Sequence, residues 1–175
     1  MSELILIIAF LMKRFILTVA SAIVATINSV GQITTKTHNV TYTINNILEL
    51  DFDNTTQNLG FTFATATDFE SGKTNVSAAG LRVRSNKSWT VSVKANTANF
   101  AATIGGDANV TANKLSVKKT GTATFLPLSI TDQTLSTGAK GGFETNTFQI
   151  DYFANPGYIS PATYTLGVTY TVSAP

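Results

Sequence analysis

The stretch that decides the fold is 81–94, which reads LRVRSNKSWTVSVK. Apolar side chains occupy every second position on both sides of the polar segment 85–88, whose composition is typical of a turn. Because successive side chains of a strand point to opposite faces, the pattern predicts a β-hairpin with one apolar face and one cationic or hydroxylated face. Trp89 is in phase with Val91 and Val93, so we expect it in the core and not on a ligand-binding surface.

The same period of two residues recurs along the chain after residue 31, where no stretch has a convincing helical period. Asn45–Asn46 marks a break or bulge, and Pro127 indicates an edge or a bulge. The alternating runs are 40–44, 48–52, 59–63, 115–117, 122–130, 143–153 and 164–172. Turn-forming residues separate these runs, and there is no internal repeat. We predict one all-β domain over 32–175, an immunoglobulin-like two-sheet antiparallel β-sandwich of about eight or nine strands.

Residues 12–31 read MKRFILTVASAIVATINSVG and have the parts of a secretory signal peptide. Two cations form its start, an apolar run follows, and small side chains at 29 and 31 precede a cleavage site before Gln32. We interpret 1–31 as a cleavable signal peptide with its true start at Met12. The alternative is an uncleaved membrane anchor, although neither apolar run reaches the roughly 18 residues that a spanning helix needs.

Export, composition and charge restrict the classes of function. The whole chain has 12 Lys and Arg against 10 Asp and Glu, and without the predicted leader ten remain against nine, a net charge of +1. This balance offers no basic excess for a nucleic acid partner. The chain has no cysteine, which excludes disulfides, Cys-based zinc sites and thiol nucleophiles. We expect a protein of the bacterial envelope, secreted or at the cell surface, with no membrane span after signal cleavage.

Few residues could carry chemistry. His38 is the only histidine, and we interpret it as a solvated polar residue because no G-x-S-x-G elbow offers it a nucleophile. The run Gly72-Lys73-Thr74 is not a phosphate loop, since the preceding glycine spacing is missing.

Carboxylates are the other candidates. Glu49, Asp51 and Asp53 alternate along one strand, with Asp68 and Glu70 further on. Alternate positions lie about 6.5–7 Å apart, too far to chelate one ion unaided, so we predict a solvated strand face, with a calcium site as the alternative. The others lie in or near predicted loops without a pattern that defines a glycosidase pair: Asp107, Asp132, Glu144 and Asp151. We predict no catalytic, cofactor-binding or metal-binding residue, and no enzyme.

Aromatic side chains offer the remaining chemistry, since sugars stack on exposed rings. Tyr158, beside Pro156-Gly157, is the best loop aromatic, and Tyr152 and Phe153 point to opposite faces of a strand.

Two segments carry a resemblance: 85–93, SNKSWTVSV, and 157–175, GYISPATYTLGVTYTVSAP. They resemble the WxL-type surface domains and the related spore-coat-U and fimbrial-subunit-like sandwiches of bacteria. Those families carry a Trp followed two residues later by an aliphatic residue, here Trp89 and Val91, and they end in a Thr-rich strand. Tyr170 stands where a second Trp is expected in WxL domains, so cell-wall binding is not carried over. The resemblance implies an exported, non-enzymatic surface sandwich.

Together these observations predict a structural or adhesive surface protein that assembles with itself or with other envelope proteins. Two alternatives stay open. One is a carbohydrate- or peptidoglycan-binding module with a glycan as partner. The other is a pilus subunit that exchanges a strand with its neighbour. In the latter case 40–52 could be donated, but it reads equally well as a native first strand, and 164–172 is expected to be an integral, paired strand.

Overall fold

The structure is a computed structural model that describes residues 2–26, 33–53 and 59–175. The contacts divide the chain into two units, Met1–Thr43 and Ile44–Pro175. The first unit contains helix α1, Ser2–Thr26, followed by residues 33–43, which are exposed and have no regular secondary structure. Among the described helices none has the length and apolar character needed to cross a membrane. The predicted cleavage site before Gln32 lies outside the described residues.

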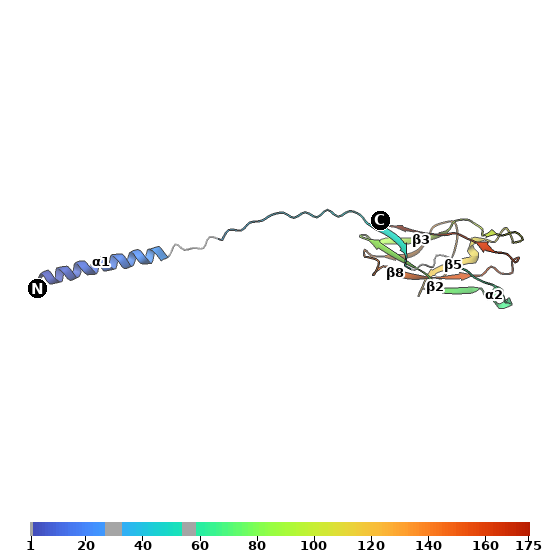
Figure 1. Cartoon of the computed structure of the whole chain (residues 1–175), viewed down its shortest axis with the longest axis horizontal. Helices are drawn as coiled ribbons and strands as arrows, with labels where there is room; N and C mark the ends of the chain where they lie inside the picture. Colours follow the sequence, from blue (N-terminus) through green and yellow to red (C-terminus); the bar gives the residue numbers. More distant parts are fainter. Residues whose placement is uncertain (1, 27–32, 54–58) are drawn as a thin grey trace. The chain divides into compact units, whose positions relative to one another are not determined.

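The second unit is built from antiparallel strands (Figure 1). Ten strands lie within the described residues, so the prediction of an antiparallel β fold is confirmed for a mostly β structure, with a slightly higher strand count than expected. They are β1 Leu48–Phe52, β2 Lys73–Ser85, β3 Trp89–Ala95, β4 Ala101–Ala102, β5 Leu115–Lys119, β6 Leu126–Pro127, β7 Gln133–Gly138, β8 Thr147–Ala154, β9 Tyr164–Thr165 and β10 Val168–Ser173. A short helix α2, Ala66–Ser71, and a 3-10 turn η1, Ala112–Lys114, complete it.

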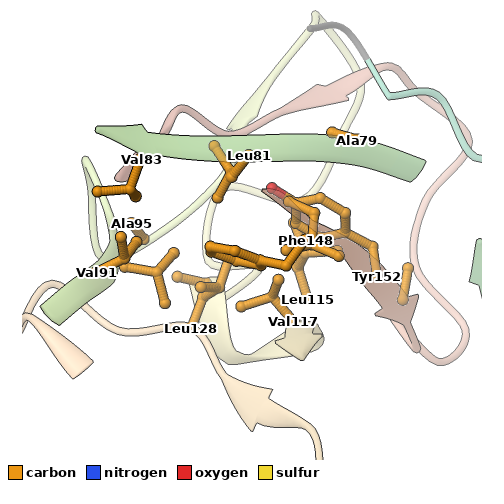
Figure 2. Close-up of a cluster of buried hydrophobic side chains, with 14 of the residues drawn as sticks. Ala79, Leu81, Val83, Val91, Ala95, Leu115, Val117, Leu128, Phe148 and Tyr152 are labelled. Atoms are coloured by element: carbon orange, nitrogen blue, oxygen red, sulfur yellow. The ribbon is translucent and has the colours of Figure 1, made fainter. Parts of the chain in front are cut away.

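The strands form three sheets that include a curled half-barrel. The largest has the order β1-β2-β8-β5-β6, the second has the order β10-β3-β7, and β4 pairs with β9. The five- and three-stranded sheets contribute to one core (Figure 2). Leu81 and Val83 of β2 meet Val91 and Val93 of β3 there, and each of the four is at most 1% exposed.

The connection in 81–94 differs from the predicted hairpin. The turn at 86–88 is present, and the apolar residues on both sides point into the core as expected. However, β2 pairs with β1 and β8, whereas β3 pairs with β10 and β7. The turn therefore carries the chain from one sheet to the other. Alternation cannot distinguish the two arrangements, because a hairpin and an arch between facing sheets both direct every second side chain inward.

Other predicted strands are shorter than expected or absent. Residues 40–46 and 59–63 form no strand, and in 122–130 only Leu126–Pro127 pairs. The run 143–153 becomes β8, which starts at Thr147 and buries Phe148, Ile150 and Tyr152 on one face, as predicted. Leu59, Phe61 and Phe63 do contact the core, so their alternation reflects packing without backbone pairing.

The C-terminal run also divides. β9 and β10 belong to different sheets, and the break falls at Leu166-Gly167. All six residues of β10 pair with β3, from Val168 opposite Ala95 to Ser173 opposite Thr90. The prediction of an integral, paired C-terminal strand is therefore confirmed for 168–173.

Helix α2 was not predicted. Thr65 accepts a hydrogen bond from the Asp68 amide, and the Asp68 carboxylate accepts one from the Thr65 amide, which makes a capping box. At its end, Gly72 has φ 73°, a conformation that favours glycine, and a Cβ there would lie 2.7 Å from the Ala154 carbonyl oxygen. A helix of six residues is too short to show a period, so only the T-x-x-D capping signal could have revealed it.

Candidate functional site

The residues considered for catalysis do not come together. His38 is exposed and lies in the segment without secondary structure. Gly72 ends α2, and Lys73 begins β2 and forms an ion pair with Asp68 at 3.3 Å. The ion pair joins the first turn of α2 to the start of β2, so Asp68 and Lys73 both have a structural role.

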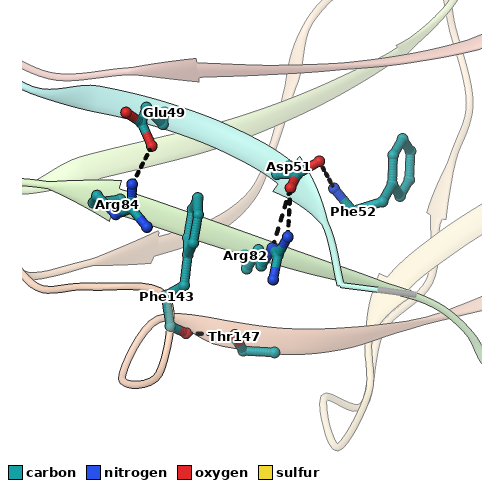
Figure 3. Close-up of polar contacts among 7 residues, drawn as sticks. All are labelled: Glu49, Asp51, Phe52, Arg82, Arg84, Phe143 and Thr147. Atoms are coloured by element: carbon teal, nitrogen blue, oxygen red, sulfur yellow. Dashed lines mark hydrogen bonds and ion pairs between the residues drawn. The ribbon is translucent and has the colours of Figure 1, made fainter. Parts of the chain in front are cut away.

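Two carboxylates of the acidic strand face form ion pairs with arginines of the neighbouring strand (Figure 3). Glu49 and Asp51 of β1 form ion pairs with Arg84 and Arg82 of β2, at 2.9 and 2.6 Å. The hydrogen bond from Arg82 is the main reason why the pKa of Asp51 lies below its ordinary value. The ring of Phe143 lies 4.1 and 4.7 Å from the two guanidinium carbons. These carboxylates already have cationic partners and are poorly placed to bind calcium.

The remaining carboxylates are dispersed and mostly partnered. Asp107 accepts hydrogen bonds from the amide and hydroxyl of Ser160, at 3.0 and 2.6 Å, and these bonds lower its pKa. Asp132 pairs with Lys94. Within residues 2–26, 33–53 and 59–175, no group of three or more His, Cys, Asp or Glu side chains is placed to hold a metal ion.

Asp151 has a structural role that the sequence did not reveal. It is 4% exposed and faces a β-bulge in β2, where Ser77 has φ 52°. Its carboxylate accepts hydrogen bonds from the Ser77 amide at 2.9 Å and the Thr120 hydroxyl at 2.5 Å, with Lys118 at 3.8 Å. Burial opposes ionisation, but these contacts outweigh it and hold the pKa of Asp151 below its ordinary value.

Trp89 is confirmed as a core residue, 4% exposed. Its indole N–H donates to the Ala139 carbonyl at 2.9 Å, and its ring stacks on Phe148 with centroids 6.2 Å apart. The predicted division between Tyr152 and Phe153 is also observed, since Tyr152 is buried and Phe153 is half-buried. The Tyr152 and Tyr170 hydroxyls contact each other, and burial raises the pKa of both.

A crevice in the core lies between β1 and β10, the edge strands of the two larger sheets. It is lined by residues of both strands and of β2, namely Leu50, Asp51, Phe52, Leu81, Val168 and Tyr170. The inward-facing side chains of β1 and β10 are only half-buried, whereas their counterparts in β2 and β3 are buried. The hydrophobic core is therefore less completely buried along this seam, which we call the β1/β10 seam, and the rings of Phe52 and Tyr170 meet edge to face across it with centroids 6.2 Å apart.

The segment before β1 is the second unusual feature. Val40, Tyr42 and Ile44 are 65, 85 and 81% exposed, and none of the residues 33–47 lies in a strand. The alternation that predicted a strand is present, but no described edge pairs with it. Three apolar side chains in strand spacing are thus left in water. We call residues 40–44 the N-terminal arm.

Asn86 holds the backbone where the arm meets the domain. Its side chain donates to the Asn45 carbonyl at 2.8 Å and accepts from the Ile47 amide at 3.1 Å, and its own amide donates to the Ile47 carbonyl at 3.3 Å. These bonds occupy the backbone groups that a tight turn at Asn45–Asn46 would rearrange. They oppose a hairpin between the arm and β1 of the same chain.

No protein-family model matches the chain, and no curated protein matches it. The function is therefore inferred from the chain's own residues.

Proposed function

We propose that the chain is an exported, non-enzymatic surface protein of a bacterial envelope with a structural or adhesive role. In this proposal it assembles with itself by adding the N-terminal arm of one copy to the β1/β10 seam of the next. The observation that carries it is the exposed, alternating arm, Val40, Tyr42 and Ile44, in a chain whose inward side chains are only half-buried along one seam. The signal-peptide pattern of 12–31 supports export.

The proposal also covers the arrangement of the two larger sheets. We place the five- and three-stranded sheets as the two layers of an immunoglobulin-like sandwich, of the kind found in the bacterial surface families that 85–93 and 157–175 resemble. Both sheets contribute side chains to a single hydrophobic core, which supports this assignment. A strand added to the free edge of β10 would cover inward residues that are half-exposed, and Phe52, which contacts Tyr170 across the seam, would move aside to admit it.

β10 is the edge best suited to accept a strand. Its sequence, VTYTVS, has none of the usual edge protection, since it contains no charge and no proline, and its pairing with β3 has no bulge. By contrast, the β1 edge carries Glu49 and Asp51, β6 carries Pro127, and β7 pairs with β3 through a register shift.

The arm and β10 are also complementary in pattern. The arm presents apolar side chains at every second position, and so do Val168, Tyr170 and Val172. If the arm is added as a strand in register, Val40, Tyr42 and Ile44 point over the crevice. The threonines between them then point to water. Full burial of each of the three apolar side chains contributes about 1.5–3 kcal/mol, and the backbone hydrogen bonds of the added strand contribute further against the association cost of about 4–15 kcal/mol.

The experiment compares the mature chain, 32–175, with a variant in which Val40, Tyr42 and Ile44 are all Thr. Threonine keeps the strand propensity and removes the apolar surface. The matched control is Ile130→Thr, at an isoleucine that is 61% exposed and lies outside both arm and seam. Light scattering after size exclusion should show concentration-dependent assembly of the wild type and the control, and a monomeric triple variant. A monomeric wild type, or assembly that survives the triple substitution, would contradict the proposal.

A further inference from the structure

We propose that Tyr158 forms a binding platform for a carbohydrate, on which the flat C–H face of a pyranose ring packs. This inference is independent of strand exchange, because Tyr158 lies outside the arm and outside the residues that line the β1/β10 seam.

Tyr158 combines exposure with fixed geometry. Its side chain is 72% exposed, yet one face stacks on Phe69 with centroids 5.4 Å apart and an interplanar angle of 18°. Its hydroxyl donates to the Glu70 carboxylate at 3.2 Å. By comparison, the side chain of Tyr42, the other strongly exposed tyrosine, makes no ring contact or hydrogen bond with the described residues. A ring that is already fixed loses little conformational entropy when a ligand binds to it.

The support beneath the ring continues towards the core. Phe69 contacts Phe63 at 5.7 Å, and Phe63 contacts Phe61 at 6.4 Å. Phe61 and Phe63 pack against the core cluster. This aromatic series links the loop 155–160 to α2 and to the domain interior, so Tyr158 is held from below while its remaining surface faces solvent.

The loop itself is fastened from the other side. Ser160 donates twice to Asp107, the Asp107 amide donates to the Tyr164 hydroxyl at 2.9 Å, and that hydroxyl donates to the Ser160 carbonyl at 2.7 Å. Gly157 has φ 70°, which fixes the turn immediately before the tyrosine. The position of the ring is therefore set by two neighbouring loops as well as by the stack.

The chemistry of the platform fits a sugar. A gluco-configured pyranose presents axial C–H groups on a flat face, which pack on an aromatic ring, and equatorial hydroxyls at its rim. Here a carboxylate, Glu70, lies at the ring edge and can accept a hydrogen bond from such a hydroxyl. A single ring with one polar group is too small for a stable protein interface, which buries about 1,200–2,000 Å². For one ring we expect weak binding, with Kd on the order of 1 mM.

Saturation-transfer difference NMR tests sugar binding to Tyr158, because it detects weakly bound ligands directly. It works with assembled as well as monomeric protein. The probes are cellohexaose and chitohexaose, added to the mature chain and to two matched variants, Tyr158→Ala and Tyr42→Ala. Both substitutions remove an exposed tyrosine, and circular dichroism checks that each variant is folded. We expect saturation of the sugar C–H protons with wild type and with Tyr42→Ala, and affinity about tenfold weaker with Tyr158→Ala.

A second variant separates the ring from its polar neighbour. Tyr158→Phe keeps the stack on Phe69 and removes the bond to Glu70, so it should retain more binding than Tyr158→Ala. The proposal is overturned if neither oligosaccharide receives saturation from the wild type. It is also overturned if Tyr158→Ala binds as the wild type does, or if Tyr42→Ala loses as much. Loss of assembly by arm variants with unchanged sugar binding would separate this site from the strand-exchange proposal.

Discussion

Trp89 and Gly138 form a tight contact between β3 and β7 that can be tested quantitatively. Trp89 is opposite Gly138 in the sheet, and a Cβ added at 138 would lie 2.1 Å from Cζ2 of the indole. Removing a buried Trp side chain costs about 3–5 kcal/mol of unfolding free energy, so Trp89→Ala should show a loss of this size. Gly138→Ala should cost about 1–3 kcal/mol, because the methyl group displaces a packed ring.

The two positions should also be coupled. Trp89→Phe removes the six-membered ring of the indole that lies over Gly138, so the added methyl group finds space in that background. We therefore expect Gly138→Ala to cost at least about 1 kcal/mol less when Phe is at 89 than when Trp is there.

Urea unfolding of the mature chain, followed by far-UV circular dichroism, measures all four free energies of the cycle. Circular dichroism is needed because Trp89 is the only tryptophan and its fluorescence disappears in the Trp89 variants. A loss below about 1 kcal/mol for Trp89→Ala, or strict additivity of the two substitutions, would refute this reasoning.

Three further predictions concern other parts of the chain. Ionised Asp151 stabilises the fold fully above its ordinary pKa of 3.8, and this stabilisation is lost as the pH falls through the lower pKa of the folded state. Asp151→Asn should therefore cost about 1–3 kcal/mol of unfolding free energy at pH 7 and flatten the fall in stability below pH 4. Urea unfolding between pH 2 and 7 measures this, and equal pH profiles for the wild type and the variant would contradict it. Deleting 163–175 removes β9 and β10 and should leave an unfolded or aggregated chain by circular dichroism and size exclusion; a stable truncated domain would mean that β10 is dispensable. Mass spectrometry of the exported protein should give an N-terminus at Gln32, within about three residues, and an intact Met1 or Met12 terminus would contradict cleavage.

The sequence predicted the class of fold because strand alternation reports which side chains face a core. It placed Trp89 and the inward residues of β8 and β10 correctly for this reason. It could not distinguish an arch from a hairpin at 86–88, since sheet membership depends on partners that are distant in the chain. The pairing of β3 with β10 joins residues more than seventy positions apart.

Alternation also failed where the partner strand is missing. The arm at 40–44 has the pattern of a strand, but within the described part of the chain no edge pairs with it. The alternation in a sequence shows that a segment has an apolar face that can be buried. It does not show whether the partner strand belongs to the same chain or to another molecule. Similarly, the place of Tyr158 beside Pro156-Gly157 indicates an exposed loop residue, whereas its stack on Phe69 depends on α2, a helix too short to show a period in the sequence.

The most direct test of the proposed assembly is disulfide formation between two copies, which the absence of cysteine from the chain makes clean. One mature chain carries a single Cys at Thr41 or Thr43 of the arm, and a second chain carries a single Cys at Thr169 or Thr171 of β10. Side chains that face each other on neighbouring strands are close enough for a disulfide to form. The control acceptor is Thr137→Cys, at an exposed position of the other edge of the same sheet.

Strand addition at β10 predicts that, on mixing under mild oxidation, at least one arm–β10 pairing gives a disulfide-linked dimer of the two different chains. The same arm cysteines should give little product with Thr137→Cys. Equal cross-linking to Thr137→Cys, or no cross-link in any of the four arm–β10 pairings, would contradict assembly through this seam.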